Sequence, residues 1–167
     1  MHKNIDKTRR RLITGAGGLG LILVAPAIIT GPTLASAGET HIVKARGVKF
    51  APMFIYANPG DKVAFENMAS HNVETLDALC PEGQEKVNSE LGDNIVMQVD
   101  TVGIVSYKCT PHWGNRMGGF IVVGEPENPE ALIDGYIKIT EEQKEYLPAR
   151  GLLKKLKKDM KKQGKIA

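Results

Sequence analysis

The sequence predicts an all-β domain, a Greek-key β-sandwich, with a C-terminal extension of two short α-helices. Three observations lead to this fold class. Apolar and polar residues alternate in short runs between residues 39 and 124, turn-forming residues separate the runs, and the pattern becomes helical after residue 124. Alternation with a period of two is typical of strands that bury one face, and many short strands divided by turns favour a sandwich.

Three alternating runs carry the strand signal. Their apolar members are Val63 and Phe65, then Ile95, Met97 and Val99, then Val105 and Tyr107. A continuous apolar run at residues 120–123 closes on Gly124, and turn signals lie at residues 58–61, 92–94 and Gly103. We therefore expect residues 38–124 to form the sandwich.

The extension comprises residues 125–167, which we expect to form a linker and helices that pack on the sandwich. Residues 130–134 predict a single helical turn. Thr140 followed by Gln143 predicts a capping box at the start of a helix. That helix is expected to end just before Pro148, because the residue before a proline disfavours the helical conformation.

The second helix of the extension, expected over residues 152–163, is amphipathic. Leu152, Leu153, Leu156 and Met160 fall on one stripe, and lysines fill most of the other positions. We expect the stripe to pack on the sandwich while the lysines face water. The alternative is a basic amphipathic helix that binds a membrane surface or a partner.

The first 37 residues predict a cleaved export signal. Basic residues precede a glycine-rich apolar stretch at residues 12–30, and Ala35-Ser36-Ala37 forms a small-x-small cleavage site. The run at residues 8–13 resembles a twin-arginine motif, with an ordinary Sec signal or an uncleaved membrane anchor as the alternatives. We accordingly expect a periplasmic protein, exported by the twin-arginine route, with no stable membrane association after cleavage.

Charge is distributed unevenly along the mature chain. Without the signal, 17 basic and 18 acidic residues remain, for a net charge of −1. Residues 38–149 carry a net charge of −8, and residues 150–167 carry +7. A basic tail on an acidic body indicates self-docking or a separate binding face. Nucleic acid is excluded as a partner, because aromatic and basic residues are not interleaved.

Three residues with metal-binding side chains stand in one short loop between two expected strands. They are Cys109, His112 and Met117, and His71 lies 38 residues before the cysteine. Soft sulfur ligands suit Cu(I), imidazole suits Cu(II), and two histidines with a cysteine and a weak axial methionine form the blue-copper set. Zinc sites also use Cys-x-x-His pairs, but the spare cysteine and histidine of the mature chain lack the matching spacing.

Three motifs carry a family resemblance: Asn58-Pro59-Gly60-Asp61, His71-Asn72-Val73-Glu74, and Cys109-Thr110-Pro111-His112 with Met117. Over about residues 47–124 they resemble the cupredoxins, the blue (type 1) copper proteins, and within them the pseudoazurin group. The resemblance implies one type 1 copper per chain, held by His71, Cys109, His112 and Met117. It also implies a monomeric carrier of single electrons between periplasmic redox proteins, such as a c-type cytochrome and a nitrite reductase.

The neighbours of the expected ligands have roles of their own. Asn72 and Thr110 are expected to hydrogen-bond the two ligand-bearing loops together. Pro111 has no N–H to donate to the sulfur of Cys109. Fewer such bonds leave more electron density on the thiolate, which favours Cu(II) and lowers the reduction potential.

The edge of the His112 ring is the expected port for the electron. A docking patch of His112, Trp113, Pro111 and Met53 is expected around it, by loop adjacency and family resemblance. A flat apolar patch of this kind suits brief, small interfaces. The alternative for Trp113 is a packed core tryptophan.

Three classes of function compete. A copper enzyme needs a further His-rich copper site, and only His41 remains in the mature chain after ligand assignment. A copper-binding or storage protein would be expected to have Met-rich or His-rich clusters, which the sequence lacks. We therefore expect an electron carrier and not an enzyme, with storage as the alternative. His41 itself is expected on the surface.

Two features depart from the pseudoazurin pattern. Cys80 is expected to be a small, partly buried thiol, with a disulfide to Cys109 as the alternative for two cysteines in an exported chain. Basic residues near the site are few, since only Lys49, Lys108 and Arg116 can be placed there. This scarcity puts the usual partners of the group in question.

Overall fold

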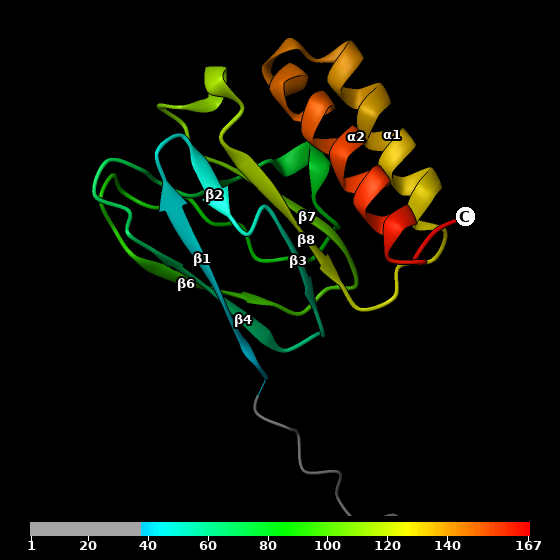
Figure 1. Cartoon of the computed structure of the whole chain (residues 1–167), viewed down its shortest axis with the longest axis horizontal. Coiled ribbons are helices and arrows are strands. Elements are labelled where there is room, and N and C mark those ends of the chain that lie inside the picture. Colours follow the sequence, from blue (N-terminus) through cyan, green and yellow to red (C-terminus); the bar gives the residue numbers. More distant parts are fainter. Residues whose placement is uncertain (1–37) are drawn as a thin grey trace, which may run out of the picture. The chain divides into compact units, whose positions relative to one another are not determined.

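Two four-stranded sheets form the sandwich (Figure 1). The computed structural model describes residues 38–167, so the expected export signal, with its twin-arginine run and cleavage site, lies outside the described residues. The strands are β1 (Thr40–Arg46), β2 (Lys49–Ala51), β3 (Phe54–Ala57), β4 (Asp61–Glu66), β5 (Glu74–Thr75), β6 (Ile95–Val99), β7 (Gly103–Lys108) and β8 (Gly118–Val123).

The chain passes repeatedly from one sheet to the other. One sheet has the order β2-β1-β4-β6, which we call sheet A, and the other has the order β3-β8-β7-β5, called sheet B. Strand pairs β1–β4 and β3–β8 are parallel, and the remaining pairs are antiparallel. The predicted β-sandwich is confirmed.

The core between the sheets is built from the alternating residues of the sequence. Val63, Phe65, Met97 and Val99 of sheet A are at most 2 % exposed, and so are Val105 and Tyr107 of sheet B. Two phenylalanines, Phe50 and Phe65, meet the Tyr107 ring edge to face, with ring centroids 5.3 and 5.0 Å away. Such aromatic contacts stabilise a core beyond the area they bury.

A second apolar layer covers the outer face of sheet B. Leu152, Leu153, Leu156 and Met160 are buried there against Ile104, Phe120 and Val122, and Figure 1 shows both helices beside β7 and β8, on the side away from β1 and β4. The expectation that the leucine stripe packs on the sandwich is confirmed. Because β7 and β8 are covered on both faces, Ser106 is fully buried, although strand alternation alone would place it in water.

The second helix ends at Lys162, as expected, but the other helix boundaries predicted for the extension are wrong. Helix α1 (Pro129–Glu142) is continuous, since Asn128 caps it by accepting from the Ala131 N–H (3.3 Å) and proline is tolerated in a first turn. Thr140 lies in its last turn, where the hydroxyl donates to the Ile137 carbonyl. Helix α2 (Leu147–Lys162) has Pro148 near its start, so this proline opens a helix instead of ending one.

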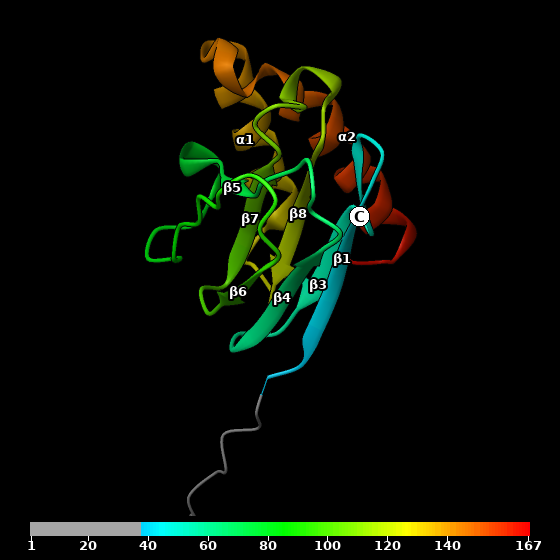
Figure 2. The same cartoon turned by 90° about the vertical axis from the view of Figure 1, so that its left-hand side faces the viewer.

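Short elements connect these parts. The 3-10 turns are η1 (Asp77–Leu79), η2 (Trp113–Asn115) and η3 (Lys144–Tyr146). Within residues 38–167, none of the helices combines the length and the apolar character needed to cross a membrane. Turn η2 belongs to the β7–β8 connection, which lies at the same end of the molecule as the α1–α2 connection in Figure 1 and Figure 2.

Candidate metal centre

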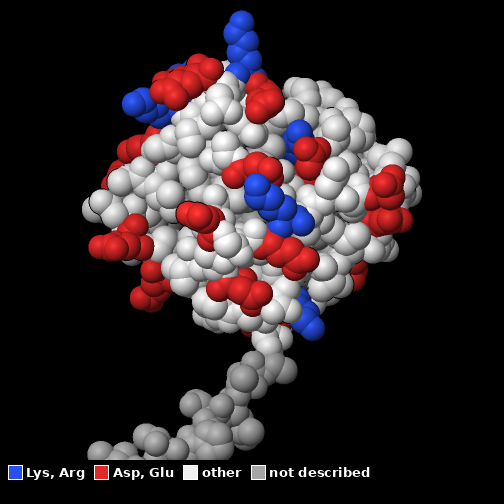
Figure 3. Space-filling view, turned by 180° about the vertical axis from the view of Figure 1, so that it is seen from behind, with Lys and Arg blue, Asp and Glu red and all other residues white. Residues whose placement is uncertain are grey.

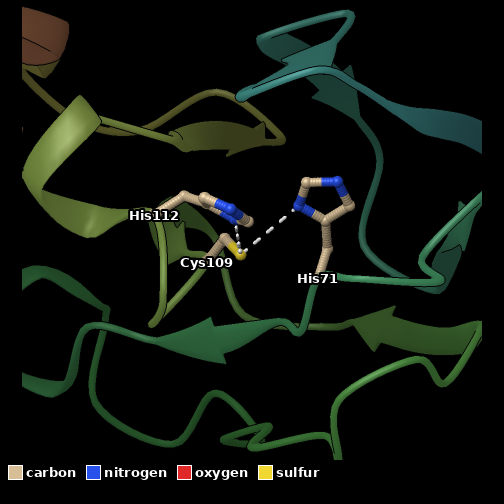
Figure 4. Close-up of side chains that lie close together, drawn as sticks. All are labelled: His71, Cys109 and His112. Carbon is tan, nitrogen blue, oxygen red and sulfur yellow. Dashed lines mark hydrogen bonds between the residues drawn. The ribbon is translucent and has the colours of Figure 1, made fainter.

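Three side chains from two distant segments meet at one point (Figure 4). Cys109 directly follows β7, His112 directly precedes η2, and His71 comes from the β4–β5 connection. The Cys109 sulfur lies 3.6 Å from Nδ1 of His71 and 3.4 Å from Nδ1 of His112. The ligand atoms of all three residues lie within 4.8 Å of one another.

These separations fit one shared metal ion. A first-row ion such as zinc lies about 2.3 Å from a thiolate sulfur and about 2.0 Å from an imidazole nitrogen, so two such ligands at a trigonal or tetrahedral angle are about 3.5–3.8 Å apart. The distance from the Cys109 sulfur to His71 Nδ1 (3.6 Å) lies within that range, and the distance to His112 Nδ1 (3.4 Å) is just below it. A thiolate with two imidazoles is the donor set that suits copper in both oxidation states.

The three residues differ sharply in their exposure. Cys109 is fully buried and His71 is 7 % exposed, whereas His112 is half-buried. Burial, followed by the neighbouring His112, lowers the pKa of His71. A lowered pKa keeps this imidazole neutral near neutral pH, and the neutral ring is the form that binds a metal.

Backbone hydrogen bonds close the loop around Cys109. The Cys109 N–H donates to the Met117 carbonyl (2.9 Å), and the His112 N–H donates to the Cys109 carbonyl (3.2 Å). The Met117 N–H in turn donates to the His112 carbonyl (3.3 Å). Met117 is fully buried in the same core cluster as Cys109, so the loop begins and ends next to the three donors.

A polar network joins the two segments that carry these donors. The Asn72 side chain accepts from the Thr110 N–H (2.7 Å) and donates to the Thr110 hydroxyl oxygen (3.1 Å). The Thr110 hydroxyl donates to Glu74, whose carboxylate also pairs with Lys108 (3.2 Å). Asn72 and Thr110 thus make hydrogen bonds between the two segments, as expected from the sequence. The contacts of Glu74 with Thr110 and Lys108 were not predicted, although its position three residues after His71 could have suggested them.

The surroundings of His112 are partly apolar and partly open. Pro111 is exposed, while Trp113 and Met53 are half-buried. The Trp113 indole N–H donates to the Glu145 carbonyl (2.8 Å) in the α1–α2 connection. Trp113 therefore combines the two alternatives raised for it, since one edge packs on the helical extension and the rest stays accessible.

The two cysteines of the chain are both free. The Cys80 thiol, half-buried at the edge of sheet B, donates to the Ser106 carbonyl (3.5 Å) and accepts from the Ser106 N–H (3.4 Å). Burial raises the pKa of Cys80 to about 11. The expectation of a partly buried thiol is confirmed, and the alternative of a disulfide with Cys109 is wrong.

His41, expected on the surface, is only partly exposed. Its side chain is 19 % exposed, and its Nε2 lies 3.1 Å from a carboxylate oxygen of Asp61. Asp61 also accepts from the N–H groups of Glu39 and Asn58, both at 2.8 Å. His41 is therefore tied to a buried carboxylate in the neighbouring strand β4, away from the Cys109 cluster.

A Greek-key sandwich whose β7–β8 loop brings one cysteine and one histidine against a second, upstream histidine defines a mononuclear blue copper protein. A family model of copper-binding proteins, the plastocyanin/azurin family, matches residues 37–124, more than half of the chain. The chain belongs to this family, and within it the chain is a pseudoazurin-like cupredoxin.

Individual relatives agree with this assignment. Pseudoazurin from Paracoccus pantotrophus is 35 % identical over 108 residues, which cover 62 % of this chain and 74 % of that protein. The structure of a pseudoazurin from Sinorhizobium meliloti is 35 % identical with a TM-score of 0.52, covering 57 % of this chain and 81 % of that one. Pseudoazurin from Methylobacterium extorquens AM1 gives 29 % identity and the same TM-score, covering 56 % and 82 %. The family assignment establishes copper as the cofactor, with one site per chain.

Proposed function

We propose that this protein is a periplasmic one-electron carrier, and not an enzyme, whose type 1 copper alternates between Cu(II) and Cu(I). The observation that carries the proposal is the cluster of His71, Cys109 and His112, with ligand atoms within 4.8 Å of one another. We propose Met117 as the weak axial ligand, because the loop returns it to Cys109 by a backbone hydrogen bond. Copper supplies the redox couple, and the chain supplies the ligands and their fixed positions.

Rigidity of the ligand positions is what an electron carrier requires. The Asn72–Thr110 bonds join the two donor segments, and the Cys109–Met117 bond closes the loop on itself. Cys109 and Met117 are fully buried in a packed core, where side chains have little room to move. Ligands held in this way change position little between oxidation states, so little energy is spent on reorganisation during transfer.

His112 is the proposed port for the electron. It is the least buried of the four proposed ligands, while the other three are at most 7 % exposed. Pro111, Trp113 and Met53 form the proposed docking patch with the His112 ring. A Trp113→Glu variant that keeps its copper is expected to react more slowly with protein partners, and an unchanged rate would contradict the patch.

The absorption spectrum after addition of copper tests the proposed site. Two histidines with one cysteine should give an intense band near roughly 600 nm together with a reversible Cu(II)/Cu(I) couple. Cys109→Ser should abolish the band. Met117→Leu should keep the band and raise the reduction potential, because loss of the fourth ligand disfavours Cu(II) more than Cu(I), which accepts a lower coordination number. A colourless copper-loaded protein would refute both the site and the function.

The proposed partners are periplasmic redox proteins, such as a c-type cytochrome as one partner and a nitrite reductase as the other. The relatives named above support this, as does the expected export signal at residues 1–37, for which we propose the twin-arginine route. N-terminal sequencing of the protein recovered from the periplasm should find Gly38 first. A first residue at Met1 would contradict the cleaved signal.

A further inference from the structure

A row of exposed lysines follows the outer side of helix α2. Lys155, Lys158 and Lys162 are spaced by three and four residues, so they share one face of the helix. This face is exposed, whereas the stripe of Leu152, Leu156 and Met160 is buried against sheet B. From Lys155 to Lys162 the row spans about 10 Å, at 1.5 Å per residue.

The row is continuous with the loop that holds the proposed copper ligands. Gly151 lies four residues before Lys155 on the same face, and the atoms nearest to a side chain at Gly151 would be Nη1 and Cδ of Arg116, at 3.8 and 4.0 Å. The Arg116 side chain therefore lies close to Gly151 of α2, and Arg116 directly precedes Met117. Arg116, Lys155, Lys158 and Lys162 together form what we call the basic track.

Charges of the basic track are not neutralised within the described part of the chain. Among residues 38–167, ion pairs on α2 involve Arg150, Lys157 and Lys161, which contact acids of α1. None involves the four members of the track. Asp159, the only acid of α2, accepts from the Tyr56 hydroxyl (2.8 Å) and the Gln163 amide (2.7 Å) instead.

The backbone of Arg116 gives a second indication. Arg116 has a φ of 60°, in the left-handed region that costs a non-glycine residue free energy. Glycine would avoid this cost in the exposed turn. Residues in such conformations cluster at functional sites, and Arg116 stands in the same loop as Cys109, His112 and Met117.

We propose that the basic track is a docking surface for an acidic face of a redox partner. This inference rests on the proposed electron-carrier function. A partner attracted along the track is brought to the end where Arg116 and His112 lie, so docking and electron transfer are coupled by geometry. An anionic lipid surface fits less well, because the apolar face of α2 is buried and has nothing to insert into a membrane.

Opposite charge on the other side of the loop fixes the orientation of the partner. Glu74, which is paired with Lys108, and the exposed Glu90 line a hollow beside Thr110 and Pro111, and acidic side chains predominate on the face shown in Figure 3. The copper loop therefore lies between an acidic side and a basic side. A partner with a single acidic face is attracted by the track and repelled by the hollow, so one orientation is favoured.

Charge reversal at the distal end of the track tests the proposal without altering the ligands. The variant Lys158→Glu/Lys162→Glu is compared with Lys62→Glu/Lys138→Glu, which makes the same change in net charge at exposed lysines on β4 and α1. The reduced copper proteins are mixed with an acidic c-type cytochrome in a stopped-flow instrument at about 0.01 M ionic strength, where charges act over about 30 Å.

We expect the track variant to react about tenfold more slowly than the control variant, since steering by charge changes association rates by tenfold or more. The difference should vanish at about 1 M salt, and with a basic cytochrome its sign should reverse. Equal rates for the two variants would overturn the proposal. Loss of binding to phosphatidylglycerol vesicles, with an unchanged rate toward the acidic cytochrome, would assign the track to lipid and also overturn it.

Failure of this proposal is distinguishable from failure of the electron-carrier function. The blue absorption and the reversible Cu(II)/Cu(I) couple depend on His71, Cys109 and His112, which neither double variant touches. If both signals are present and the rates are equal, the track alone is refuted. If the wild-type protein lacks the blue absorption and the reversible couple, the electron-carrier function itself is refuted.

Discussion

Substituting Asn72 by alanine should separate the two segments that hold the proposed copper ligands. Asn72 is 8 % exposed and makes two hydrogen bonds to Thr110, one to its N–H and one to its hydroxyl oxygen. Each bond contributes about 1 kcal/mol net. Thr110 is itself exposed, so water can reach its freed N–H and the additional desolvation penalty is small. We expect the free energy of unfolding of the copper-free protein to fall by about 2 kcal/mol.

The same substitution should also weaken copper binding. Groups that orient metal ligands typically account for 10- to 100-fold in affinity, and the Asn72–Thr110 bonds orient Cys109 relative to His71. Urea unfolding of the copper-free protein gives the first quantity, and competition with a chelator of known affinity gives the second. The spectrum of the variant should retain the blue band, since all four proposed ligands remain.

Asn115→Ala is the matched control for this experiment. Asn115 is an exposed asparagine of the same loop, and within the described residues its side chain makes no hydrogen bond. Its replacement should change the free energy of unfolding by less than about 0.5 kcal/mol. An Asn72→Ala variant as stable as the Asn115→Ala variant, with unchanged copper affinity, would refute the view that these bonds hold the two segments together.

Three further predictions concern other groups. Hydrogen bonds from the Asn58 N–H and from His41 lower the pKa of Asp61, so its stabilising effect is complete above about pH 5 and is lost as the pH falls below about 3.9, the ordinary pKa of aspartate. In urea unfolding, Asp61→Asn should be less stable than wild type by about 2 kcal/mol at pH 7, with the difference shrinking toward pH 3; a constant difference would argue against the ionised carboxylate. Pro111→Ala should raise the reduction potential measured by voltammetry, because the new N–H can donate to the Cys109 sulfur, and an unchanged or lower value would contradict this. A thiol reagent at pH 8 should modify Cys80 in the copper-loaded protein on the order of a hundredfold more slowly than in the unfolded chain, because a raised pKa leaves little thiolate; equal rates would show that the thiol is not shielded.

The strands and the proposed ligands could be predicted because they depend on local pattern and spacing. Val63 and Phe65 alternate with polar neighbours whatever the rest of the chain does, and the residues between Cys109 and Met117 are too few to separate them widely. The helix boundaries could not be predicted in the same way. Pro148 can end one helix or open the next, and only the position of Leu152 and Leu156 against sheet B decides between these uses.

Contacts between residues far apart in sequence were also beyond prediction. His41 pairs with Asp61 because β1 and β4 are neighbouring strands, a pairing that no local pattern indicates. The bond from Trp113 to the Glu145 carbonyl spans 32 residues and needs both connections at the same end of the molecule. Likewise, the sequence could not show that the basic track continues from α2 to the copper loop. That continuity depends on the proximity of Arg116 to Gly151, which is a property of the folded chain.

One sequence feature did contain information about the extension, and it links the fold to the site. The run at residues 120–123 is apolar at every position, so a strand there must bury both faces. The other sheet covers one face of β8, and α1 and α2 cover the other face.

The same helices contact the copper loop. The α1–α2 connection holds Trp113 through the Glu145 carbonyl, and α2 lies against Gly118, where an added Cβ would come within 2.9 Å of the Trp113 ring and 3.3 Å of Leu152. The loop with Cys109, His112 and Met117 thus joins two strands packed on both faces and is braced on its outer side. Helices that are remote in sequence from the ligands therefore contribute to the rigidity on which electron transfer depends.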